Sequence, residues 1–148
     1  MRRALAHRSW CAEVGGEESN ERLEFLGDAV LGWIVAELAY RQHADLAEGK
    51  LTDLRKSVVN ATALADVATE LGIGPFLLLG KGEAAAGGRA KPSILSDAFE
   101  AVLGAVYLDG GAAAAAALVE RLFVRRMAAA AQRLDRLDYK TVLQELTA

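Results

Sequence analysis

The stretch Asn20-Glu21-Arg22-Leu23-Glu24-Phe25-Leu26-Gly27-Asp28 opens a long apolar segment that runs to about Tyr40. No proline interrupts this segment and Asn20 is a favourable N-cap, so we expect one long helix. In a helix Glu24 and Asp28 stand at i and i+4, which places both carboxylates on one face. The other positions are apolar nearly all round, and such a helix belongs at the centre of a domain. Two acids on a central helix therefore need a physical reason.

A second pair of acids, Asp97 and Glu100, stands at i and i+3 in the apolar segment Ser93–Leu108. Gly104 falls on the same helical face as this pair, and Gly27 lies beside Glu24 of the first pair. Glycine inside a helix costs about 1 kcal/mol relative to alanine, and close approach of another helix can offset that cost. We therefore predict that the two helices cross at their glycines and bring four carboxylates together.

Four ionised carboxylates in one pocket repel one another, by about 3 kcal/mol for a pair roughly 5 Å apart at an effective dielectric constant near 20. A divalent cation would neutralise them, and ligands that are all oxygen suit Mg²⁺, with Mn²⁺ as a substitute, better than Zn²⁺. The alternative is that the acids form ordinary ion pairs with Arg22, Arg55 or Arg89. The spacing of the acids alone leaves both interpretations open.

Six blocks of sequence, spread over nearly the whole chain and in family order, resemble one enzyme family. They are Ala4–Trp10 (ALAHRSW), Asn20–Asp28 (NERLEFLGD), Glu48–Asn60 (EGKLTDLRKSVVN), Leu78–Glu83 (LLGKGE), Lys91–Gly111 (KPSILSDAFEAVLGAVYLDGG) and Asp138–Leu146 (DYKTVLQEL). The family is ribonuclease III, and the resemblance is to the catalytic endonuclease domain of the bacterial type. A match of six blocks in order is far more specific than a match of one nine-residue motif.

The resemblance implies an all-α, homodimeric endonuclease that hydrolyses double-stranded RNA with Mg²⁺. It implies products with 5′-phosphate and 3′-hydroxyl ends, and a role in processing ribosomal RNA and other structured transcripts. By motif position, the catalytic residues would be Glu24, Asp28, Asp97 and Glu100. The resemblance implies that three of them bind the metal directly and that Asp28 acts through a water molecule.

Further residues are candidates for the RNA cleft and for the dimer interface. The RNA-cleft candidates are Glu21, Glu48, Lys81, Arg89 and Lys91. The two acids resemble family acids near the cleft. The three basic residues lie in Gly80–Pro92, which we expect to be either a loop that holds RNA phosphates or an ordinary surface loop. Phe25 matches a family aromatic residue that inserts into the partner subunit, although a core position in its own subunit would explain the same pattern.

The composition favours one all-α domain over residues 1–148, because the chain is rich in alanine and leucine and has only 2 prolines. The single cysteine, Cys11, excludes an internal disulfide and a cysteine zinc site. We expect a cytoplasmic protein without a signal peptide, because His7 and Arg8 break any apolar region near the start. We also expect no membrane span, because Asp28 and Glu37 interrupt the longest apolar stretch. The net charge of −3 counts against a nucleic-acid partner, but bound cations would invert the field at the acid pocket.

The pattern of apolar residues and breakers also predicts where the elements lie. We expect helices at Met1–Trp10, Glu21–Tyr40, Leu51–Val59, Ala61–Leu71, Ser93–Leu108, Ala112–Ala131 and Tyr139–Leu146, with loops or breaks at Cys11–Ser19, Gly80–Pro92, Asp109–Gly111 and Asp135–Leu137. Asn60 is the expected N-cap of the helix that it precedes. Members of the family usually have one more helix before Ala4–Trp10 and a double-stranded-RNA-binding domain after Asp138–Leu146. We expect this chain to hold the endonuclease domain without that RNA-binding domain.

Two other functions fit parts of the pattern. All-α nucleoside triphosphate pyrophosphohydrolases hold Mg²⁺ with ExxE and ExxD motifs; Glu21-x-x-Glu24 fits the first, but Asp97-x-x-Glu100 is reversed. The other alternative is a catalytically silent ribonuclease III-like module that only binds RNA or dimerises. Loss of one of the four acids would indicate such a module, and all four are present.

Overall fold

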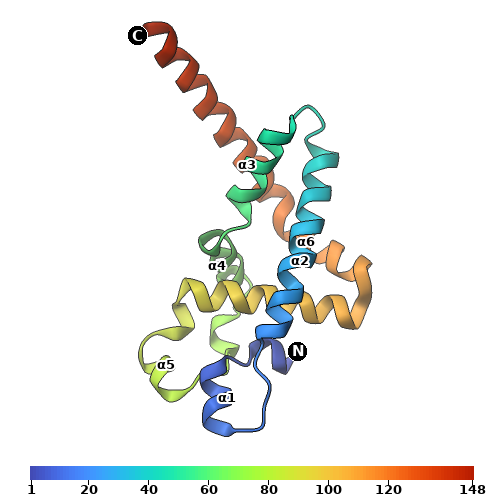
Figure 1. Ribbon diagram of the computed structural model, residues 1–148, viewed down its shortest axis with the longest axis vertical. Coiled ribbons are helices and arrows are strands. Elements are labelled where there is room, and N and C mark those ends of the chain that lie inside the picture. Colours follow the sequence, from blue (N-terminus) through green and yellow to red (C-terminus); the bar gives the residue numbers. More distant parts are fainter.

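The computed structural model describes all residues, 1–148, and is an all-helical structure, as predicted (Figure 1). The elements are η1 (Arg2–Leu5), α1 (Arg8–Val14), α2 (Glu21–Gln42), α3 (Glu48–Val58), α4 (Ala61–Glu70), η2 (Gly74–Phe76), α5 (Lys81–Ala85), η3 (Gly88–Ala90) and α6 (Pro92–Thr147). The only extended pairing is an isolated parallel bridge between Ala6 and Leu78.

Helix α2 is the central helix, as predicted. It buries Leu31, Ile34 and Val35 almost completely, and its main partner is the first half of α6, which crosses it (Figure 1). Asn20 occupies the N-cap position of α2 as predicted, but its side chain accepts no bond from the first turn. Asn20 is instead buried, and its Nδ2 donates to the Ala4 carbonyl at 3.1 Å, which ties η1 to the start of α2.

Helix α6 consists of two helices joined at Gly111, whose φ of 81° and ψ of −176° interrupt the helical backbone. This bend confirms the predicted turn at Asp109–Gly111. The second half buries Val119, Phe123 and Met127 along one face. The rings of Phe99 and Phe123, from the two halves, lie 6.0 Å apart between centroids, so the bend folds α6 back onto the common core.

By length and composition alone, α6 is long and apolar enough to cross a membrane. Its apolar character has a local explanation, because both halves bury residues in the core and the backbone bends between them at Gly111. The helix also carries Asp97 and Glu100 in its first half.

The N-terminal segment differs from the prediction of one helix at Met1–Trp10. The chain leaves the helical conformation at Ala6, where the His7 amide donates to the Leu78 carbonyl at 3.0 Å and the Leu78 amide donates to the Leu5 carbonyl at 2.9 Å. The His7 side chain then caps α1 by accepting from the Ser9 amide. Residues 11–14, expected in a loop, therefore belong to α1.

The segment Gly80–Pro92 is also more ordered than the predicted loop, since it contains α5 and η3. The Arg89 guanidinium holds it down, because Nη1 donates to the carbonyls of Gly74, Pro75 and Leu77, with the shortest distance, 2.6 Å, to Leu77. These bonds tie η3 to η2.

The two short helices after α2 confirm the prediction closely. Asn60 caps α4 as expected, with its Oδ1 accepting from the Ala63 amide at 2.9 Å. Gly72, at a φ of +69°, lets the chain turn after α4, a backbone conformation that favours glycine.

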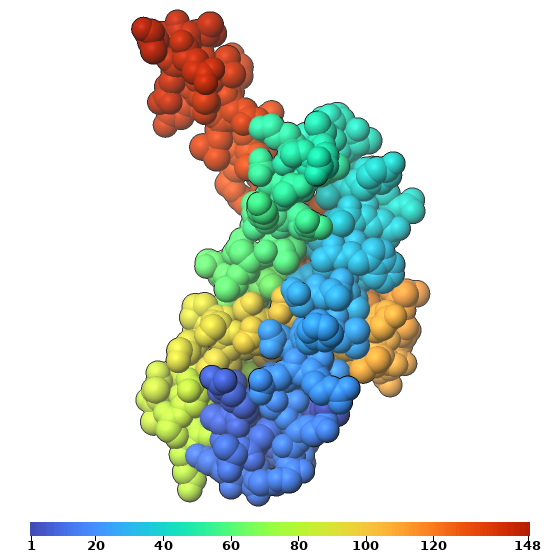
Figure 2. Space-filling model, viewed as in Figure 1, coloured from blue at the N-terminus to red at the C-terminus, as the bar shows by residue number.

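The predicted break at Asp135–Leu137 is wrong, because α6 continues without interruption to Thr147. No glycine or proline occurs in that stretch, so its polar residues do not stop the helix. The end of α6 stands away from the body of the domain (Figures 1 and 2). Tyr139, Val142, Leu143 and Leu146 are all largely exposed there.

Candidate metal centre

The crossing of α2 and α6 is close enough for their main chains to touch. A Cβ atom on Gly27 would overlap the carbonyl oxygen of Glu100, and one on Gly104 would stand 2.5 Å from the carbonyl oxygen of Leu23. Only glycine fits at both positions. The prediction that the helices cross at these two glycines is confirmed.

The crossing brings one carboxylate oxygen each from Glu24, Asp97 and Glu100 to within 4.8 Å of one another. Glu24 and Asp97 are partly exposed, whereas Glu100 is 7% exposed and lies at the bottom of the cluster. Asp28 lies on the same face of α2 one turn further on and is exposed; it is not one of the three. Its charge still reaches Glu24 and Glu100, because it raises the pKa of both.

The cluster has no cationic partner. None of its acids forms an ion pair, so the alternative of ordinary pairs with arginine is wrong. Arg89, one of the arginines considered for that role, bonds backbone carbonyls instead. Burial first, and then the neighbouring carboxylates Asp28, Glu24 and Asp97, raise the pKa of Glu100 to about 8.

Burial and neighbouring carboxylates likewise raise the pKa of Glu24. Burial also raises the pKa of Asp97, against the opposing charges of His7 and Arg8. Three acids with raised pKa values in one place mark a group of charges that the protein alone does not neutralise. The donors are all carboxylate oxygens, which is the ligand set that Mg²⁺ and Mn²⁺ prefer. The residues therefore fit a hard divalent cation.

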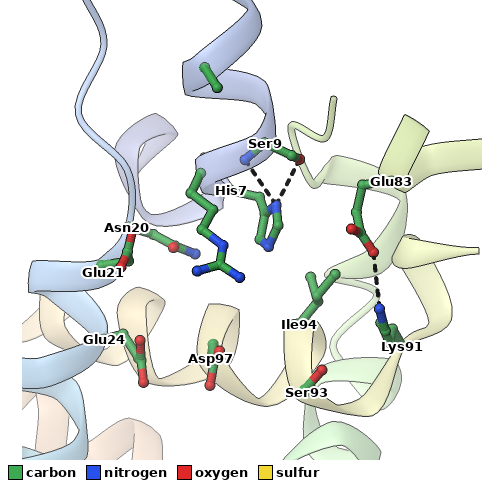
Figure 3. A pocket seen from close by; sticks show the side chains of 12 residues that line it. His7, Ser9, Asn20, Glu21, Glu24, Glu83, Lys91, Ser93, Ile94 and Asp97 are labelled. Atoms are coloured by element: carbon green, nitrogen blue, oxygen red, sulfur yellow. Dashed lines mark hydrogen bonds and ion pairs between the residues drawn. The ribbon is translucent and has the colours of Figure 1, made fainter. Parts of the chain in front are cut away.

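A polar cavity of about 680 Å³ opens beside the cluster and collects some of the predicted RNA-cleft residues (Figure 3). Glu21 and Lys91 line it together with Glu24 and Asp97. Lys91 also pairs with Glu83, with 3.3 Å between Nζ and Oε1.

The other candidates for the RNA cleft lie elsewhere. Lys81 and Arg89 are exposed but do not line this cavity. Glu48 begins α3, beyond the far end of α2 from the cluster, so it does not meet the cavity within one chain (Figure 1). Phe25 is 80% exposed, which rules out a core position in its own subunit.

Sequence reasoning did not place three lining residues, His7, Arg8 and Ser93, in the site. The first two belong to the Ala4–Trp10 block, in which neither spacing nor periodicity indicates a role for Arg8. Their position depends on the bridge between Ala6 and Leu78, a contact between distant single residues that leaves no periodic pattern.

Fold and cluster together define an all-α domain with a carboxylate centre that can hold a divalent cation. A family model described as ribonuclease-III-like matches residues 1–127. The chain belongs to this ribonuclease-III-like family.

Individual relatives agree with the family model. Ribonuclease 3 of Thermobifida fusca is 58% identical over 148 residues, which are 100% of this chain and 62% of that protein. Ribonuclease 3 of Streptomyces coelicolor is 56% identical over 146 residues, 99% of this chain and 53% of that protein. The chain thus spans between 53% and 62% of the length of these two curated relatives.

A solved structure also matches, the nuclease domain of ribonuclease III from Campylobacter jejuni, which is described as flexible in a region involved in dimer formation. It superimposes with a TM-score of 0.75 at 43% identity, over 82% of this chain and 85% of that one.

Proposed function

We propose that this domain is a Mg²⁺-dependent endoribonuclease that hydrolyses phosphodiester bonds in double-stranded RNA and acts as a homodimer. The observation that carries the proposal is the cluster of three carboxylates within 4.8 Å of one another, supplied by two crossing helices and left without a cationic partner. Membership of the ribonuclease-III-like family gives this cluster a reaction. Processing of ribosomal RNA and other structured transcripts is the role that we propose for it.

We propose two kinds of contact between the four acids and the cation. Glu24, Asp97 and Glu100 would bind it directly, and Asp28 would reach it through a water molecule. When bound, Mg²⁺ would supply an activated water and stabilise the charge that develops on the 3′-oxygen as the bond from phosphorus to that oxygen breaks. Water then adds to phosphorus, so the products would carry 5′-phosphate and 3′-hydroxyl ends. Mn²⁺ has the same ligand preference and would substitute.

The residues of this chain would hold the cation in a fixed place. The main-chain contact between Gly27 and the Glu100 carbonyl sets the distance between the two acid pairs. The exposed side of Glu24 and Asp97 opens to the polar cavity, from which a phosphodiester would enter (Figure 3). Because the cation would activate the water, the proposal needs no side-chain base.

The dimer proposal rests on an exposed apolar surface near the centre. Phe25 is 80% exposed and Leu108 is 65% exposed, and both line one apolar hollow together with Leu23 and Leu26. An aromatic side chain left this exposed is suited to a protein interface. A two-fold axis through this surface would use Phe25 twice.

The experiment that tests the proposal incubates the protein with a long RNA duplex and Mg²⁺ and resolves the products on gels. We expect cleavage of duplex RNA in preference to duplex DNA and single-stranded RNA, because A-form duplexes are recognised by shape and 2′-hydroxyl groups. The Glu100→Ala variant and a chelator serve as controls and should stop cleavage. Cleavage of single strands at an equal rate would contradict the proposal, as would hydrolysis of nucleoside triphosphates with no action on RNA.

A further inference from the structure

The cavity beside the acid cluster has a side that is suited to an anion. Only 2 of its 12 lining residues are hydrophobic, so it fits a charged or polar ligand. Glu24 and Asp97 form one side, and the ring of His7 projects into the cavity above them (Figure 3). Arg8 and Lys91 also line the cavity and bring positive charge to it.

Arg8 is the unpaired cation of this cavity. Its side chain is exposed and takes part in no ion pair, whereas Lys91 is paired with Glu83. Arg8 lines the same cavity as Glu24 and Asp97, so its guanidinium lies beside the acid cluster. A guanidinium near a metal centre with its donors free can bind a further anion, and its planar fork matches phosphate oxygens.

His7 presents a fixed hydrogen-bond donor to the same space. Its Nδ1 accepts from the Ser9 amide at 3.2 Å and contacts Ser9 Oγ at 2.7 Å, while Ser9 Oγ itself accepts from the Gly80 amide at 2.9 Å. The hydroxyl proton of Ser9 is therefore directed to Nδ1. In the neutral ring this leaves the proton on Nε2, which has no partner in the protein.

The first turn of α6 contributes further to this side of the cavity. Ser93 and Ile94 line it, and their backbone amides belong to the helical turn that lacks intrahelical acceptors. No acid stands in that turn and no side chain caps it. They add to the positive character that Arg8 gives to the cavity.

We propose that this cavity is a subsite for the backbone phosphate next to the scissile one on the same RNA strand, and that Arg8 binds that phosphate. The inference rests on the proposed function. The acid cluster attracts a phosphate only when it holds a cation, whereas the Arg8 guanidinium carries its positive charge without one. The other charged residues of the lining are the acid Glu21 and the ion pair of Lys91 with Glu83. Two neighbouring phosphates would then be held by different means, and the second contact would fix the position of the strand over the cluster.

The test compares Arg8→Ala with Arg121→Ala, since Arg121 is also exposed and unpaired but lies outside the cavity. Both are made in a Glu100→Gln background, which prevents cleavage, and binding of a fluorescently labelled RNA duplex is measured over a series of salt concentrations. We expect Arg8→Ala to bind roughly tenfold more weakly and to lose about one phosphate contact from the slope of log K against log salt. Arg121→Ala should match the background, and Arg8→Lys should recover most of the slope because it keeps the charge.

The outcomes separate this inference from the proposed function. Equal affinity and slope for Arg8→Ala and Arg121→Ala, with cleavage by the unmodified chain intact, would overturn the subsite and leave the nuclease proposal standing. An unmodified chain that neither binds nor cuts duplex RNA would overturn both. Thermal unfolding of Arg8→Ala should match that of the unmodified chain; a clear fall would show that Arg8 supports the fold and would also overturn the assignment.

Discussion

Replacing Glu100 by glutamine should stabilise the metal-free protein while it removes metal binding. Glutamine has nearly the shape of the protonated acid but cannot ionise. Glu100 is 7% exposed and stands among the other acids of the cluster, so its negative charge is unfavourable in the folded state. The variant therefore separates the electrostatic cost of the Glu100 charge to folding from the contribution of that charge to metal binding.

The pKa of Glu100 sets the size and the pH range of the effect. The pKa rises from 4.5 to about 8 on folding, so between these values the unfolded chain releases a proton that the folded chain retains. The contribution of Glu100 to folding stability is constant below pH 4.5, falls by about 1.4 kcal/mol per pH unit above it, and levels off above pH 8. The full cost is roughly 3–5 kcal/mol. Glu100→Gln should remove this cost, so its advantage over the unmodified chain should grow with pH.

The assay is denaturant unfolding with a chelator present, at fixed protein concentration, repeated from pH 4 to pH 9. The exposed Glu120→Gln change on the same helix is the matched control for the loss of one carboxylate. The series is then repeated with Mn²⁺, which stabilises the native state by about 2.7 kcal/mol at 100 times Kd. We expect that gain in the unmodified chain and little of it in Glu100→Gln.

Two results would refute this reasoning. If the free energies of unfolding of Glu100→Gln and the unmodified chain ran parallel over the whole pH range, the buried charge would carry no folding cost. If Mn²⁺ stabilised both proteins equally, Glu100 would not be a ligand.

Three further predictions concern the crossing, the interface and the number of centres. Gly27→Ala should unfold more easily because its Cβ overlaps the main chain of α6, whereas Gly32→Ala on the same helix meets nothing within 4 Å and should gain up to about 1 kcal/mol of folding stability. Thermal unfolding distinguishes the two variants, and equal shifts in melting temperature would contradict the crossing. Phe25→Ala should weaken the dimer, since burying a phenylalanine contributes roughly 2–3 kcal/mol. Sedimentation at several protein concentrations measures the dissociation constant of the dimer, and an unchanged constant would place the interface elsewhere. A purified mixed dimer with one Glu100→Ala subunit should nick one strand of duplex RNA, as seen by comparing native and denaturing gels, and full double-strand cleavage would contradict one centre per subunit.

The central helices and the acid cluster could be predicted because helical periodicity carries the information. The spacings of Glu24 with Asp28 and of Asp97 with Glu100 place each pair on one face, and the two glycines mark where the faces meet. The cap at Asn60 was predictable for a similar reason, since capping is a local interaction.

The errors arose where contacts between distant residues decide the structure. Asn20 is a residue type that favours capping with its side chain, but its side-chain amide donates to the carbonyl of Ala4 instead. The break at Ala6 and the position of Arg8 depend on the bridge to Leu78, which lies far along the chain. Local propensity contains no signal for such a contact.

The main-chain contact at Gly27 and Gly104 has a consequence for how the protein can change. Where side chains separate two helices, exchanging residues can change the distance between the helices. Where two main chains are in direct contact, that distance is fixed by the backbone atoms. The distance between the acid pairs therefore does not depend on the volume of the side chains in the surrounding core. Substitutions in that core can alter stability while the geometry of the acid cluster stays the same, whereas a single methyl group at either glycine would move the acid pairs apart.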